Sequence, residues 1–93
     1  MPKLNDDDIA TALKGLDGWT REGDVIAREV KFEGFPDAVA FVTRVGFAAE
    51  KADHHPDVDI RYNRVRVALS THSEGGITAK DLALAAEAEG AAG

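Results

Sequence analysis

The sequence predicts a single α+β domain, residues 1–93, in which helices cover one face of a four-stranded antiparallel sheet. Two observations predict this class. The spacing of apolar residues switches between helical and strand periods in the order α-β-β-α-β-β-α, with the strands arriving as two hairpins. The chain of 93 residues is also only long enough for one buried core.

The first helix is predicted to begin after Asn5, whose side chain can accept a hydrogen bond from the first turn. The aspartates at positions 6–8 suit the positive end of the helix dipole. The apolar period then changes to two, which predicts strands over residues 19–22 and 25–32. Gly23 lies between them and indicates a tight turn.

The longest helix is predicted over residues 36–53, because Pro36 fits a first turn and apolar residues follow at helical spacing. It ends before Pro56, since the residue preceding a proline avoids the α conformation. Strands are expected over residues 57–62 and 65–71, with the turn at residues 63–64.

The last helix is predicted over residues 79–89, and the residues after it are expected to fray. Thr78 and Asp81 have the spacing of a capping box, in which the side chain of residue 81 reaches back to the helix start. Asp81 could equally point into a nearby polar site, and the sequence leaves both alternatives open.

Composition excludes several classes of function. Seventeen acidic and 11 basic residues give a net charge of −6, which argues against generic binding to nucleic acid or anionic lipid. The absence of cysteine excludes thiolate catalysis and cysteine-ligated metals. No apolar stretch is long enough for a membrane span or a signal peptide, so a cytoplasmic protein is expected.

The three histidines, His54, His55 and His72, all fall beside the second predicted hairpin. If that hairpin turns near residue 63, residue 72 returns close to residues 54–56, which predicts a cluster. Imidazole exchanges protons near neutral pH, so the cluster predicts an acid–base site. A catalytic zinc accepts three imidazoles, but adjacent histidines are poorly spaced ligands for one ion, and no metal is expected.

Two further residues have open roles at this stage. Glu50 lies one helical turn before His54, so it either orients an imidazole or forms an ordinary solvated pair. Tyr62, the single tyrosine, is either a pocket wall or part of the sheet packing.

The segments Ala49-Glu50-Lys51-Ala52-Asp53-His54-His55-Pro56, Tyr62-Asn63 and Leu69-Ser70-Thr71-His72 closely resemble the pterin-4a-carbinolamine dehydratases. The resemblance covers nearly the whole chain. The residues that match the motif of that family are Glu50, His54, His55, Pro56, Tyr62, His72 and Asp81.

The resemblance implies dehydration of 4a-hydroxytetrahydrobiopterin to the quinonoid dihydropterin, as part of pterin recycling for an aromatic amino acid hydroxylase. It implies a homodimer or homotetramer whose sheet continues across the dimer, and no metal or organic cofactor. The catalytic residues it implies are His54, His55 and His72. The residues it implies for substrate binding are Glu50, Pro56, Tyr62, Thr71, Ser73, Glu74 and Asp81.

Two alternatives remain at this stage. The first is a binding module that uses the same fold for dimerisation, with weak catalysis. The second is a dehydratase-like protein acting on another pterin, such as one related to molybdopterin. The chain also departs from the family pattern: Val58 stands where members often have Trp, Asp59 follows it, and the carboxylate of Glu74 is shifted by one place.

Overall fold

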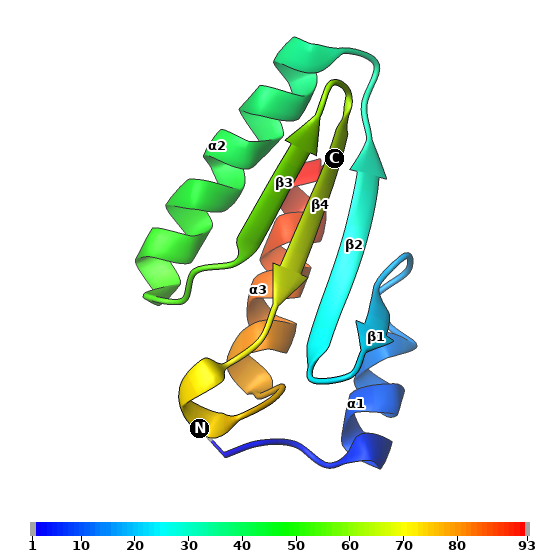
Figure 1. Cartoon of the computed structure of the whole chain (residues 1–93), viewed down its shortest axis with the longest axis vertical. Coiled ribbons are helices and arrows are strands. Elements are labelled where there is room, and N and C mark those ends of the chain that lie inside the picture. Colours follow the sequence, from blue (N-terminus) through cyan, green and yellow to red (C-terminus); the bar gives the residue numbers. More distant parts are fainter. Residues whose placement is uncertain (1, 93) are drawn as a thin grey trace.

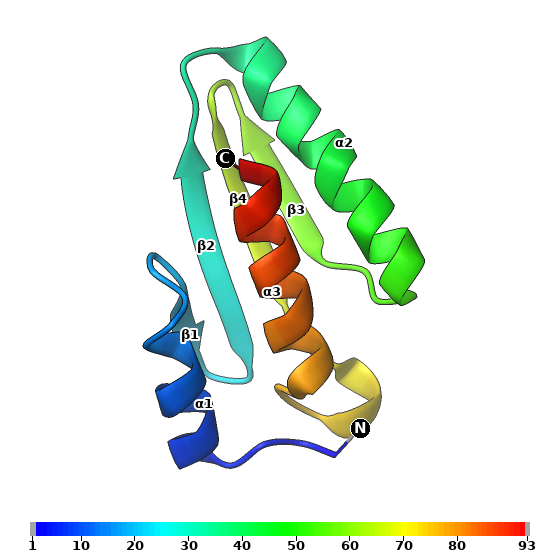
Figure 2. The same cartoon turned by 180° about the vertical axis from the view of Figure 1, so that it is seen from behind.

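The predicted order of elements is confirmed in the computed structural model, which describes residues 2–92 (Figure 1). The sheet has four antiparallel strands in the order β1-β2-β4-β3, and the helices cover one of its faces (Figure 2). The elements are α1 (Asp6–Leu13), β1 (Thr20–Glu22), β2 (Val25–Lys31), α2 (Phe35–Ala52), β3 (Asp57–Arg61), β4 (Arg64–Leu69), a 3₁₀ turn η1 (His72–Glu74) and α3 (Ala79–Ala92).

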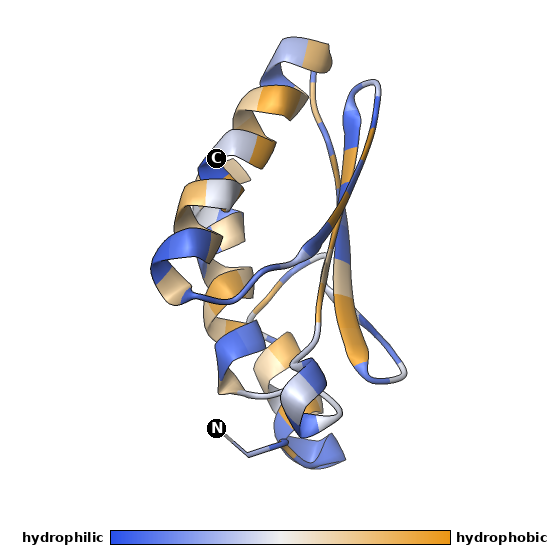
Figure 3. Ribbon diagram, turned by 60° about the vertical axis from the view of Figure 1, so that its left-hand side comes forward, coloured by the Kyte–Doolittle hydropathy of each residue, from blue (hydrophilic) through white to orange (hydrophobic). Residues whose placement is uncertain are grey.

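The core lies between the sheet and the helices, where the strands alternate apolar and polar residues (Figure 3). The two central strands, β2 and β4, supply most of its sheet side because both of their edges are paired. The residues that fill it from the strands are Ile26, Val30, Val65, Val67 and Leu69, and those from the two long helices are Ala38, Phe41, Val45, Ala49, Leu84, Ala85 and Ala88. Within residues 2–92, none of the helices has both the length and the apolar character to cross a membrane.

The turn between β3 and β4 differs from the prediction by one residue. It is formed by Tyr62 and Asn63, with Arg61 paired to Arg64 and with Tyr62 in the left-handed region at φ 51°. Asn63 is held by contacts with a distant residue: its carbonyl accepts from Phe32 N at 2.8 Å, and its side-chain amide donates to Phe32 O at 2.9 Å. These contacts fix the register of the hairpin.

The last helix is longer than predicted, since α3 continues to Ala92. Its final turn is held by Arg44 of α2, whose Nε donates to the carbonyl oxygen of Ala91 at 2.9 Å. A cationic side chain at the carboxyl end of a helix satisfies a free carbonyl and interacts favourably with the helix dipole. The predicted fraying is therefore wrong for residues 90–92, which continue the helix, and for Gly93 the prediction lies outside the described residues.

Candidate active site

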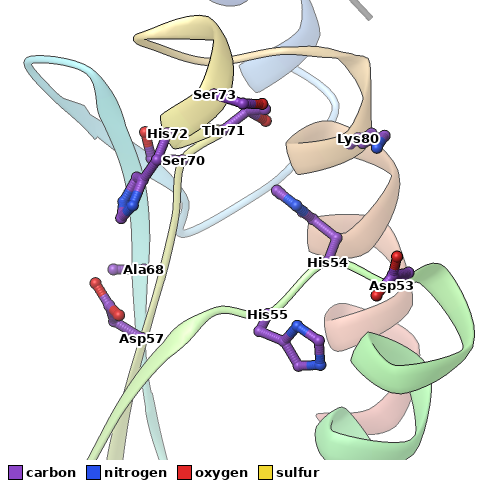
Figure 4. Close-up of a pocket in the computed structure, with 10 residues that line it drawn as sticks. All are labelled: Asp53, His54, His55, Asp57, Ala68, Ser70, Thr71, His72, Ser73 and Lys80. Atoms are coloured by element: carbon purple, nitrogen blue, oxygen red, sulfur yellow. The ribbon is translucent and has the colours of Figure 1, made fainter.

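The three histidines line one cavity of about 320 Å³ at the end of the β3–β4 hairpin, as the sequence predicts (Figure 4). His54 and His55 lie between α2 and β3, and His72 begins η1. Figure 4 shows the His72 ring above Ala68, and the His55 ring turned toward α2. The residues that line the cavity are Asp53, His54, His55, Asp57, Ala68, Ser70, Thr71, His72, Ser73 and Lys80.

Local backbone structure brings these segments together. Asp53 ends α2 in the left-handed conformation, at φ 51°, and the chain then turns into β3. The register of the hairpin pairs the first residue of β3 with Ala68 near the end of β4. The loop that carries His72 is closed at its base by the bond from Thr71 N to Gly76 O, at 2.9 Å. The two histidine segments therefore lie on opposite sides of one hairpin end.

Asp81 has both of the roles that the sequence left open: it caps α3, and it contacts a histidine of the cavity. Its Oδ2 accepts from Thr78 N at 2.9 Å, which closes the capping box at the start of α3, while its Oδ1 lies 2.5 Å from His54 Nε2. Oδ2 also accepts from the Thr71 hydroxyl at 2.8 Å. The carboxylate is fully buried and the His54 side chain is 11% exposed, so this pair is shielded from water.

Glu50 pairs with His55, and not with His54, whose face of the helix it was expected to share. Its Oε1 lies 2.8 Å from His55 Nε2, and both side chains are mainly exposed. The reason is the left-handed residue Asp53, which turns the chain away from the helical path before His54. The two adjacent histidines thus have different carboxylate partners, one in solvent and one buried.

The structure brings only part of the predicted substrate-binding set to the cavity of its own chain. Thr71 and Ser73 line it, and Asp81 lies behind His54. Pro56 and Glu74 are not among the lining residues, although they adjoin residues that are. Tyr62 lies at the opposite end of the hairpin and is 69% exposed, so its position does not support a role in this cavity.

Sequence reasoning missed five lining residues: Asp53, Asp57, Ala68, Ser70 and Lys80. Strand register supplies a signal for Asp57 and Ala68, which are direct partners on the open face of the sheet. Lys80 precedes Asp81 in the first turn of α3, and only the packing of that helix brings it to the cavity. Among residues 2–92, no group of three or more His, Cys, Asp or Glu side chains is arranged to hold a metal ion. The expectation that no metal or organic cofactor takes part stays a prediction.

Fold and cavity together define a small α+β protein with a histidine-lined site in which each of two imidazoles has a carboxylate partner. Residues 2–91 match the family model described as pterin 4 alpha carbinolamine dehydratase. The chain belongs to this family.

Relatives match the sequence of this chain over almost their full length. A protein of Mycobacteroides abscessus is 59% identical over 85 residues, which are 91% of this chain and 90% of the relative. One from Chloroflexus aurantiacus is 55% identical over 86 residues, which are 92% of each chain. Both carry the provisional name pterin-4-alpha-carbinolamine dehydratase.

Solved structures show the same fold. A transcriptional coactivator/pterin dehydratase from Brucella melitensis matches with a TM-score of 0.94 and 40% identity, over 98% of this chain and 99% of that one. A pterin dehydratase-like protein, identified as a RuBisCO assembly factor in the alpha-carboxysome, matches with a TM-score of 0.67 over 81% of this chain and 87% of that one. At 18% identity, the second likeness concerns the fold alone.

Proposed function

We propose that this chain catalyses the dehydration of a pterin-4a-carbinolamine to the quinonoid dihydropterin, as in the recycling of a pterin used by an aromatic amino acid hydroxylase. Membership of the family supports the reaction class. The observation that carries the proposal is the convergence of His54, His55 and His72 on one cavity. Its volume of about 320 Å³ is at the lower end of the usual range for small-molecule sites and suits a single bicyclic ring.

The reaction needs a general acid and a general base. The C4a–O bond breaks and the hydroxyl group leaves as water after it receives a proton. A ring nitrogen loses its proton to a base, and the electron pair of that N–H bond forms the C=N bond. His55 and His72 exchange these two protons, and His54 holds the hydroxyl side of the ring. Glu50 and Asp81 orient the imidazoles that they contact.

A dehydration assay tests the proposal. A hydroxylase generates the 4a-hydroxypterin in place, and absorbance follows the quinonoid product against the spontaneous background. We expect the native protein to accelerate the step, and His55→Ala and His72→Ala to lose about 100-fold or more, the usual contribution of a positioned acid or base. Full activity in both variants would contradict this assignment.

A matched carboxylate pair supplies the control. Glu50→Gln removes the charge beside His55, whereas Glu29→Gln removes one from a similarly exposed position on β2. We expect the first variant to be slower and the second to match the native rate. If the native protein gives no acceleration at all, another pterin or the role of a binding module becomes the better description.

We also propose that two copies of the chain pair through β3. This strand is an edge of the sheet, and its apolar residues Val58 and Ile60 are 39% and 37% exposed. On the neighbouring helix α2, Phe47 is 76% exposed. An unpaired edge beside exposed apolar side chains is stabilised when a second strand adds to it.

Sedimentation tests this pairing. We expect the native chain to sediment as a dimer or a tetramer. Ile60→Lys, which places a charge on the exposed edge, should yield a folded monomer, and Lys31→Ala on the central strand β2 should leave the assembly unchanged. A monomeric native chain would contradict the proposal.

A further inference from the structure

A closed set of hydrogen bonds surrounds Asp81 behind the cavity. Its Oδ2 accepts from the Thr71 hydroxyl at 2.8 Å and from Thr78 N at 2.9 Å. Its Oδ1 faces His54 Nε2 at 2.5 Å. Asp81 and Thr78 are fully buried and Thr71 is 7% exposed, so water does not compete for these bonds. Among the described residues, no buried side-chain nitrogen or oxygen lacks a partner.

The direction of each bond follows from counting protons. A threonine hydroxyl has one proton to donate, and that of Thr71 goes to Asp81. The 2.8 Å contact between the hydroxyls of Thr71 and Thr78 is therefore donated by Thr78. The oxygen of Thr78 in turn accepts from Lys80 N at 3.2 Å. Every donor in the set is assigned, and Oδ2 has no room for a proton of its own.

The bond to His54 follows from the same geometry. Two donors meet Oδ2 and stabilise the ionised carboxylate, which can only accept hydrogen bonds, so Nε2 of His54 donates and Oδ1 accepts. When His54 is neutral, its other ring nitrogen, Nδ1, then carries a lone pair. His54 lines the cavity while its Nε2 is taken by Asp81, so Nδ1 is the nitrogen left for a ligand there.

We propose that Thr71 and Thr78 are positioning residues that act through Asp81 to fix His54 in the tautomer with its proton on Nε2. Neutral His54 then accepts a hydrogen bond from the 4a-hydroxyl through Nδ1. The proton that leaves with that hydroxyl must come from another imidazole, His55 or His72. This use of Nδ1 rests on the proposed function, but the tautomer does not.

Nitrogen-15 NMR of the histidine rings tests the tautomer directly in the native chain. We expect His54 at a pH where it is neutral to show an N–H on Nε2 and an unprotonated Nδ1. His55 is the comparison: its Nε2 also faces a carboxylate, that of Glu50, but its side chain is 62% exposed, so water competes for the bond and the preference for the proton on Nε2 should be weaker. A proton found on Nδ1 of neutral His54 overturns the proposal, whether or not the chain proves to be a dehydratase.

Asp81→Asn gives a sharper test, because the Thr71 hydroxyl and Thr78 N fix the orientation of the new side-chain amide. The Oδ2 position receives two donors, so the carbonyl oxygen of the asparagine has to occupy it. Its NH₂ group then faces His54 and demands an acceptor at Nε2, which moves the ring proton to Nδ1. We expect the NMR signature to reverse and kcat to fall by roughly 100-fold or more, with a smaller change in KM.

Asp37→Asn is the matched control, since Asp37 also lies in the first turn of a helix but is exposed and distant from the histidines. We expect this variant to keep the native tautomer and rate. A folded Asp81→Asn protein that keeps the proton of His54 on Nε2 overturns the proposal.

Thr78→Val tests the hydrogen bond between the hydroxyls of Thr78 and Thr71. It removes the donor to Thr71 and the acceptor of Lys80 N, and it keeps both the side-chain shape and the backbone N–H from which Asp81 accepts. We expect a loss of about tenfold in kcat, of the size of one buried hydrogen bond, and recovery in Thr78→Ser. Thr43→Val, on the exposed face of α2, is the control and should have no effect. Equal rates in Thr78→Val and the native chain contradict a positioning role for Thr78.

Discussion

Gly18→Ala is expected to lower the free energy of unfolding far more than the addition of one methyl group would imply. Gly18 has a φ of +85°, and a Cβ added there would lie 2.2 Å from Arg28 Nη1. The guanidinium has to move, yet its Nε donates to Glu89 at 2.8 Å, and the Trp19 indole donates to the same oxygen at 2.8 Å. The substitution therefore strains the backbone and displaces a partly buried ion pair.

The magnitude follows from these two costs. A left-handed backbone costs a residue with a Cβ about 1 kcal/mol. A hydrogen bond between charged groups contributes about 2 kcal/mol, and Arg28 and Glu89 are only 28% and 31% exposed. The sum is about 3 kcal/mol, and a domain of this size loses about 4 to 8 °C per kcal/mol, so we expect the melting temperature to fall by roughly 12 to 24 °C.

Gly23→Ala separates the two costs. Gly23 also has a positive φ, of +63°, but nothing lies within 4 Å of the position of its Cβ. It should lose only the backbone part, about 1 kcal/mol. Thermal and urea unfolding followed by circular dichroism measure both variants, and a double mutant with Arg28→Ala should remove the excess cost at Gly18. Equal melting temperatures for the two alanine variants would refute the reasoning.

Three further predictions concern the core and the helix ends. Phe41→Ala should cost about 3 to 5 kcal/mol in urea unfolding, because Phe41 is 1% exposed and its ring packs against Phe32; a loss below 1 kcal/mol would contradict its place in the core. Asn5→Ala should cost about 1 kcal/mol, since the Asn5 side chain accepts from Asp8 N, while Asn5→Asp should match the native stability. Arg44→Met should speed amide exchange in the last turn of α3 without changing that of α1, and unchanged exchange would show that the bond to Ala91 does not hold this end.

Features that depend on local sequence could be predicted, and most of them hold. The cap at Asn5, the proline-limited helix α2 and the alternation in β2 each reflect residues within a few positions of one another. The convergence of the histidines also follows from local information, because a hairpin returns the chain to its start. The sequence predicts the turn of this hairpin one residue too late, because the contacts that fix the turn come from Phe32, which is remote in sequence.

The arrangement of the site needed three-dimensional packing. The spacing of Thr78 and Asp81 indicates a capping box, but it does not show that the two oxygens of one carboxylate face different partners. Nor does it bring Thr71, ten positions earlier in the chain, to the same oxygen. Helical spacing predicts that Glu50 shares a face with His54. The left-handed residue Asp53 turns the chain before His54, and Glu50 contacts His55 instead.

The hydrogen bond between His54 and Asp81 makes the geometry of the site depend on the docking of the last helix. The partners of Asp81 come from the segment after α2, from the residues that follow β4 and from the residue before α3. A fluctuation that lifts the first turn of α3 from the sheet would leave every strand pair intact and still remove the only carboxylate that His54 contacts in the described chain. During synthesis, His54 and His72 leave the ribosome before Asp81 does. The site is therefore complete only once the last segment of the chain has docked against the sheet.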